Sequence, residues 1–189
     1  MSKQLPTIIT IASVVAAIWL LRRGEKGEHY FMKHDFRLNG DLPRGYRNNN
    51  PLNIRYSRFN PWRGKIIPNA DKNNTFEQFA DICYGYRAAL SLLRTYIRKY
   101  GCDTVAKVIE RWAPPTENNT QGYITDVCNI VGSSFDTHIT PDTILAANDR
   151  ERLTQIAYAM SIIENGNNKV TREAGLPDME FIKQGWEML

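Results

Sequence analysis

The stretch Arg111-Trp112-Ala113-Pro114-Pro115-Thr116-Glu117-Asn118-Asn119-Thr120 joins two segments that both have helical patterns. Pro114 and Pro115 fix the backbone and end the helix before them. Trp112 places a flat apolar face beside Glu117, and a partly buried carboxyl group beside an aromatic ring is a setting that suits a general acid. The stretch therefore predicts Glu117 as a candidate acid in a polar loop. A helix ended by proline and followed by an N-cap explains the same residues.

Helical patterns extend to both sides of this loop. Apolar residues at three- and four-residue spacing, with Asp or Thr before them and glycine after several of them, predict helices over 81–100, 103–112, 120–131, 149–165 and 178–188, with a short helical piece from 140. Upstream, short strands are predicted at 53–56, 62–67 and 75–79. The predicted fold class is a mostly helical α+β domain with a small irregular or β-containing lobe near its start.

The composition allows a real hydrophobic core, because 42% of the 189 residues are hydrophobic and 11% are aromatic. The charge is uneven: residues 22–67 carry eleven Lys or Arg and four Asp or Glu, a local net charge of +7. Such a segment suits an anionic partner, which is a phospholipid surface, a cell-wall polymer or nucleic acid. Cys83, Cys102 and Cys128 have no metal-ligand spacing, so we expect core cysteines, no metal and no cofactor.

Residues 5–21 contain no charged side chain and are flanked by Lys3 and by Arg22-Arg23. That length is just enough for a transmembrane helix, and Trp19 lies where an interfacial aromatic residue belongs. A cleaved signal peptide and a buried core helix are the alternatives. The predicted organisation is a membrane anchor over 1–23, a polar tether over 24–43 and a folded domain over 44–189.

Six short pieces in a fixed order carry a family resemblance: Arg44-Gly45-Tyr46-Arg47-Asn48-Asn49-Asn50-Pro51-Leu52-Asn53-Ile54-Arg55, Trp62-Arg63-Gly64, Phe76-x-x-Phe79, Tyr84-Gly85-Tyr86-Arg87-Ala88, the Arg111–Thr120 stretch and Tyr123-Ile124. Together they resemble the lysozyme-like family of bacteriophages and prophages, over about residues 44–132. The resemblance implies a lysozyme-like fold and cleavage of peptidoglycan, as a muramidase or a lytic transglycosylase. Together with the apolar segment 5–21, the resemblance predicts a membrane-anchored protein in a phage virion membrane or the bacterial cell envelope, used for entering or lysing the cell, with a lipid membrane, peptidoglycan and virion proteins as partners.

The resemblance makes Glu117 the first candidate for the catalytic acid, with Glu77 second and Glu28 third. The side chains expected to line a sugar groove are Asn48, Asn50, Asn53, Trp62, Trp112, Asn118 and Tyr123. Turn formation explains the asparagines equally well, and core packing explains the aromatic residues. No clear second acid is visible, which favours a lytic transglycosylase over a hydrolase. The alternative function is a non-catalytic, membrane-anchored virion protein that binds the wall. Specific nucleic-acid binding is not expected, since only the basic segment suggests it.

Overall fold

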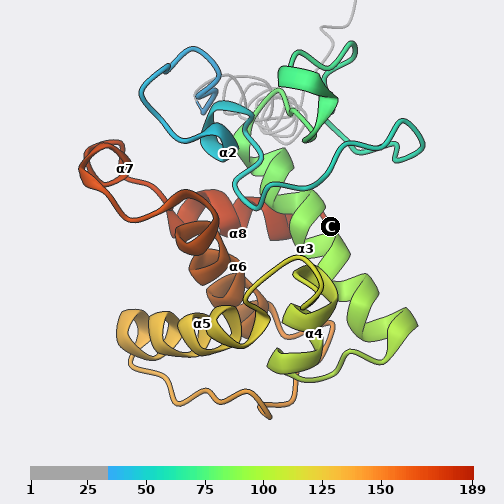
Figure 1. Ribbon diagram of the computed structural model, residues 1–189, viewed down its shortest axis with the longest axis vertical. Helices are drawn as coiled ribbons and strands as arrows, with labels where there is room; N and C mark the ends of the chain where they lie inside the picture. The colour runs from blue at the N-terminus through green and yellow to red at the C-terminus, as the bar shows by residue number, and fades with distance from the viewer. Residues whose placement is uncertain (1–33) are drawn as a thin grey trace, which may run out of the picture. The chain divides into compact units, whose positions relative to one another are not determined.

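Helices make up most of the chain that the structure, a computed structural model, describes, which is residues 34–189 (Figure 1). They are α2 (Arg44–Arg47), η1 (Lys72–Asn74), α3 (Ile82–Tyr100), α4 (Val105–Trp112), α5 (Thr120–Phe135), α6 (Arg150–Asn165), α7 (Lys169–Glu173) and α8 (Met179–Glu187). In this part of the chain the only β pairing is a few isolated bridges. The mostly helical fold class is therefore confirmed.

The long helix α3 organises the domain, since α4, α6 and α8 all pack against it (Figure 1). It begins at Asp81, whose side chain accepts a hydrogen bond from the backbone N–H of Cys83, and it ends at Gly101, which has φ 65°. Helix α8 approaches α3 closely at Gly185. A Cβ at that position would lie 2.9 Å from the Cβ of Tyr86, so only glycine allows this approach.

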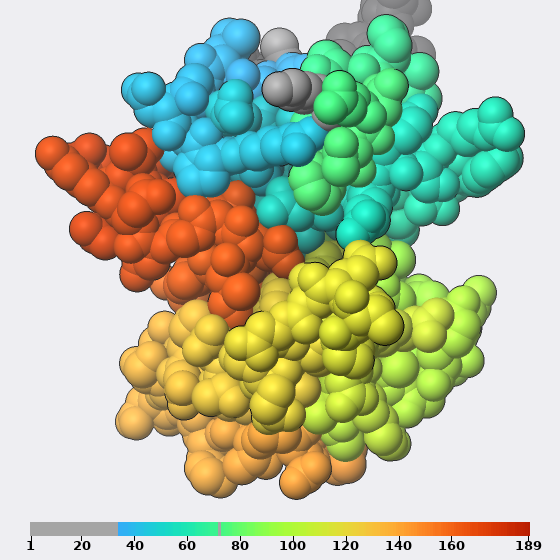
Figure 2. Space-filling model, viewed as in Figure 1, coloured from blue at the N-terminus to red at the C-terminus, as the bar shows by residue number. Residues whose placement is uncertain are grey.

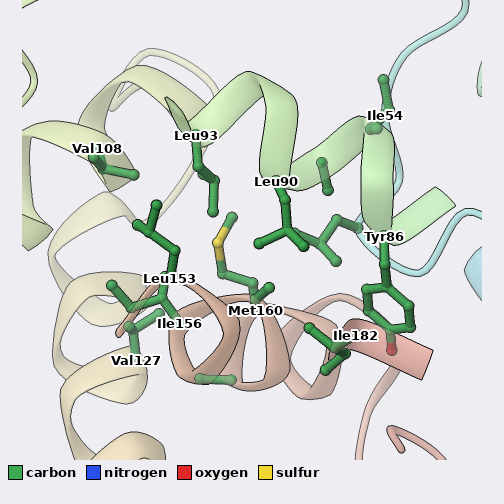
Figure 3. Close-up of a cluster of buried hydrophobic side chains, with 14 of the residues drawn as sticks. Ile54, Tyr86, Leu90, Leu93, Val108, Val127, Leu153, Ile156, Met160 and Ile182 are labelled. Carbon is green, nitrogen blue, oxygen red and sulfur yellow. The ribbon is translucent and has the colours of Figure 1, made fainter. Parts of the chain in front are cut away.

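The hydrophobic core lies where α3 and α6 meet, with α4, α5 and α8 closing it (Figure 3). Each large side chain buried there contributes about 1.5–3 kcal/mol of transfer free energy, so these contacts hold the helices together. The residues that the close-up labels in this core are Ile54, Tyr86, Leu90, Leu93, Val108, Val127, Leu153, Ile156, Met160 and Ile182.

The N-caps of two helices differ by one residue from those that the sequence favours, which are Asp103 for α4 and Thr120 for α5. Helix α4 is capped by Thr104, whose side chain accepts from the Lys107 N–H, whereas Asp103 forms an ion pair with the Lys107 side chain. Helix α5 is capped by Asn119, because the Thr120 hydroxyl instead donates to the carbonyl of Ala113 at 2.6 Å. The neighbouring polar residue provides the cap in each case.

Two further helix predictions need correction, and one observed helix was not predicted. Helix α5 passes through Gly132 and ends only at Phe135, with Asp136 in the left-handed conformation after it. The predicted helical piece from 140 is a turn, in which the Thr143 hydroxyl accepts from the Thr140 N–H. Helix α7 was not predicted, and it begins at a capping box formed by Asn168 and Thr171.

The lobe formed by residues 44–80, called here the early lobe, has no regular strand. The three predicted strands meet only at isolated antiparallel bridges, Arg55 with Phe76 and Lys65 with Phe79. A few backbone hydrogen bonds join these segments, such as that from the Glu77 N–H to the Ile54 carbonyl at 2.8 Å. Side-chain amides add to them, since the Asn50 amide donates to the carbonyls of Ile54 and Glu77, both at 3.0 Å. The early lobe is therefore irregular, which is one of the two alternatives that the sequence left open.

The predicted anchor over 1–23 and most of the predicted tether lie outside the described residues. Within residues 34–189, none of the helices combines the length and the apolar character needed to cross a membrane. The part of the tether that is described packs on the domain. Leu42 is buried, and the ring centroid of Phe36 lies 6.2 Å from that of Phe181 on α8.

Candidate functional site

A groove of about 480 Å³ opens between the early lobe and the helices. Its walls come from the early lobe, from α3, from the loop between α4 and α5, and from the end of α6. The lining residues are Asn53, Ile54, Arg55, Asn60, Phe76, Leu92, Tyr96, Trp112, Ala113, Pro114, Glu117, Asn118 and Glu164. Aromatic rings and neutral amides supply six of these thirteen residues, which are Phe76, Tyr96, Trp112, Asn53, Asn60 and Asn118.

The half-buried carboxylate in this groove is Glu164, and three side chains hold it. Oε1 accepts hydrogen bonds from the Tyr123 hydroxyl at 3.0 Å and from the Trp112 indole N–H at 3.3 Å. Oε2 accepts from the Asn53 amide at 3.0 Å. A carboxylate has about four acceptor positions, so Oε2 keeps one for a proton or a ligand. The geometry therefore fixes the acid and leaves one of its oxygens available for chemistry.

The three partners of Glu164 come from well-separated parts of the chain. Asn53 lies in the early lobe, Trp112 ends α4, and Tyr123 lies in the first turn of α5. Burial raises the pKa of Tyr123 well above its ordinary value, and the Glu164 carboxylate beside its hydroxyl adds to this rise. Tyr123 therefore stays protonated and remains a hydrogen-bond donor to the acid.

The next residue on α6, Asn165, ties the helix end to the early lobe. Its amide donates to the carbonyl of Pro51 at 2.7 Å. A Cβ at Gly45 would clash with the side-chain oxygen of Asn165 and would lie 2.9 Å from that of Asn53. Position 45 therefore has to be glycine, so that Asn53 and Asn165 can hold the end of α6 against the early lobe.

Glu117, the predicted acid, lines the groove but is not buried. Its side chain is 56% exposed, and Oε2 accepts from Nη2 of Arg55 at 2.7 Å, where the Arg55 side chain is 77% exposed. The expectation of a carboxyl partly buried against Trp112 is therefore wrong for Glu117. The Trp112 indole donates to Glu164 instead.

The other predicted acids do not reach the groove. Glu77 is fully buried and forms an ion pair at 3.0 Å with Lys65, whose side chain is 5% exposed. Glu77 also accepts from the N–H of Ser57, so it supports the early lobe from inside. Glu28 lies outside the described residues.

Among the predicted sugar-groove residues, the structure places Asn53, Trp112 and Asn118 in the lining, and Tyr123 against the acid. It does not place Asn48, Asn50 and Trp62 there. Trp62 packs against the core. The turn-forming alternative is correct for Asn48 and Asn50, which are buried within the early lobe.

The Asn48 amide donates at 2.7 Å to Asp71, which also accepts from Arg44. Burial alone would raise the pKa of Asp71, but the hydrogen bonds from Arg44, Asn48 and the Phe76 N–H outweigh it and hold that pKa below its ordinary value. Asn48 and Asp71 therefore strengthen the early lobe rather than contact a ligand.

Glu164 is the candidate site residue that the sequence interpretation missed. It stands beside the apolar stripe of α6, in the last turn of that helix, where no basic residue accompanies it. A carboxylate is disfavoured at the negative end of the helix dipole. The sequence therefore contained a signal for this site: Glu164 is an acid at an unfavourable helix position, directly before Asn165 and the helix-ending Gly166.

The described residues include no group of three or more His, Cys, Asp or Glu side chains placed to hold a metal ion. Cys83 is buried in the core, and Cys102 and Cys128 pack at its edge.

The protein is a helical domain joined to an irregular lobe, and the Glu164 carboxylate is held at their junction. The chain is 36% identical over 149 residues to Protein P5 of Pseudoalteromonas phage PM2, which covers 78% of this chain and 82% of that protein. The chain belongs to the family of this phage protein. The bacteriophage connection expected from the sequence is thereby confirmed. No family model matches the chain.

Proposed function

We propose that this chain cleaves the glycan strand of peptidoglycan, with Glu164 as the catalytic acid. The observation that carries the proposal is the Glu164 carboxyl group, which Tyr123, Trp112 and Asn53 hold in a groove of about 480 Å³. A positioned carboxyl group that donates a proton to a leaving oxygen is the basic requirement for breaking a glycosidic bond.

The groove lining suits a sugar polymer. Trp112 and Tyr96 offer flat apolar surfaces for the faces of sugar rings, and their ring centroids lie 6.5 Å apart. Asn60 and Asn118 offer neutral donors and acceptors for hydroxyl and acetamido groups. The two-lobed arrangement around an acid is also what the lysozyme-like resemblance implies. Peptidoglycan is the glycan that a phage has to cross, which agrees with the phage relative.

The position of the acids favours a lytic transglycosylase. Glu117, the other carboxylate in the groove, is paired with Arg55, whereas no ion pair joins Glu164 to a cation within residues 34–189. A hydrolase of the usual kind needs two carboxyl groups, one acting on each side of the bond. Glu164 gives its proton to the glycosidic oxygen, and the bond from the sugar's C1 to that oxygen breaks. The sugar's own hydroxyl then closes on C1, and its proton returns to Glu164.

The test is to incubate the full-length chain with purified peptidoglycan sacculi and to analyse the soluble products. We expect muropeptides that end in an anhydro ring and resist borohydride reduction. Reducible ends would show hydrolysis and would overturn the single-acid mechanism while keeping the glycan-cleaving function. If the sacculi bind the chain but release no product, the chain is a non-catalytic wall-binding virion protein. If they neither bind nor dissolve, the proposal fails.

We also propose that residues 5–21 anchor the chain in a membrane, because seventeen consecutive residues carry no charge and basic residues flank them. The full-length chain should sediment with lipid vesicles and stay bound at high salt. A variant that lacks residues 1–23 should remain in the supernatant. Release of the full-length chain by salt alone would contradict an inserted anchor, since only surface electrostatic binding is screened in this way.

A further inference from the structure

The ion pair between Arg55 and Glu117 joins the two walls of the groove. Arg55 belongs to the early lobe, and Glu117 belongs to the loop between α4 and α5. Figure 2 shows this loop, in yellow, meeting the early lobe, in cyan, along one edge. Both side chains line the same groove as Glu164. The contact therefore lies on the path of a ligand that reaches the acid.

A ligand can easily displace Glu117 from its ion pair with Arg55. The two side chains are 77% and 56% exposed, and their hydrogen bond of 2.7 Å runs from one guanidinium nitrogen to one carboxylate oxygen. Exposed pairs of this kind add little stability, because water and salt screen them. A guanidinium carries five N–H donors in a planar fork that matches a carboxylate. Another carboxylate that is held in the groove by further contacts can therefore replace Glu117.

We propose that Arg55 recognises an acidic substituent of the bound glycan, and that Glu117 occupies the guanidinium when no ligand is present. This inference rests on the proposed function for the identity of the ligand. Wall glycan carries carboxylates beside its glycosidic bonds, either on the lactyl group of muramic acid or on the attached peptide. Chitin has the same backbone without them. Arg55 thus gives the groove a preference for the acidic glycan over the neutral one.

The test measures binding by calorimetry to the full-length chain carrying Glu164→Gln, so that the ligands stay intact. Three oligosaccharides of equal length serve as probes: neutral chito-oligosaccharide, wall oligosaccharide with free lactyl groups, and wall oligosaccharide with attached peptides. Arg55→Gln should weaken binding of an acidic ligand about tenfold and leave the neutral ligand within about twofold. The acidic ligand that responds identifies the carboxylate that Arg55 contacts.

Glu117→Gln should strengthen binding of the acidic ligand about two- to fivefold, because it removes the internal competitor. With Arg55→Gln already present, Glu117→Gln should add nothing. Arg98→Gln removes an exposed charge outside the groove and serves as the control for net charge. It should change none of the three affinities by more than about twofold, since distant exposed charges are screened.

The inference would be overturned if Arg55→Gln lowered the affinity for all three ligands equally. It would also be overturned if Glu117→Gln bound the acidic glycan more weakly than the parent chain does. The outcome is separate from that of the cleavage assay. An Arg55-dependent preference in a chain that releases no products would keep the inference and sink the proposed catalysis. Absence of binding to all three ligands would show that the groove is not a glycan site and would remove both.

Discussion

Replacing Glu164 with glutamine should abolish release of soluble muropeptides, lowering the rate by about 10²–10⁴-fold or more. Glutamine keeps the side-chain oxygen that accepts from Tyr123 and Trp112, but it has no proton to donate to a glycosidic oxygen. Only the contact with Asn53 is lost, which costs about 1 kcal/mol of stability. Product release from sacculi and thermal unfolding followed by circular dichroism measure the two effects.

Glu117→Gln is the matched control, since it makes the same chemical change in the same groove at the exposed acid. We expect it to keep cleavage within about tenfold of the parent chain, because the pair that it breaks contributes roughly 0–1 kcal/mol. Full activity in Glu164→Gln together with loss in Glu117→Gln would return the catalytic role to the acid that the sequence first indicated.

Replacing Glu77 with glutamine should destabilise the domain by about 3–5 kcal/mol. Glu77 is fully buried, and the substitution leaves the Lys65 ammonium, only 5% exposed, without its counter-charge. The carbonyls of Ser57 and Asn60, which also accept from Lys65, do not neutralise it. Denaturant unfolding of the full-length variant measures the loss of stability.

The double substitution of Lys65→Met and Glu77→Leu separates structure from catalysis at this pair. It removes both charges and keeps similar side-chain volumes, so it should recover most of the stability that Glu77→Gln loses. Muropeptide release should recover with the fold. A stable double variant that releases no product would show instead that Glu77 takes part in the chemistry.

The helices were predictable because their apolar residues follow the helical period and their ends carry ordinary signals. Asp81 and Gly101 bound α3, and Asp149 and Gly166 bound α6, as the sequence indicates. The irregular lobe was harder to predict, since Asn49 and Asn53 adopt positive φ and the side-chain amide of Asn50, between them, binds backbone carbonyls. Residue propensities predict turns at such asparagines, but they do not predict which backbone carbonyls the side-chain amides will bind.

The candidate site was predicted only in part. Trp112 and Tyr123 were predicted to line a groove around Glu117, whereas both donate hydrogen bonds to Glu164, which lies on a helix that begins well after Tyr123 in the sequence. Only the fold brings Glu164 to these rings. The local sequence made Glu117 attractive because it follows Trp112 closely, yet the loop turns its side chain toward Arg55. Closeness in sequence does not show which way a loop side chain points.

The adjacent positions of Glu164 and Asn165 have a consequence for building hybrids between relatives. One residue carries the acid, and its neighbour fastens the helix end to Pro51 while packing over Gly45. Residues 44–80 and 161–165 are thus one transplantable unit, although eighty residues separate them. A chimaera that takes the first segment from one parent and the second from another disrupts the contacts that position the Glu164 carboxyl group.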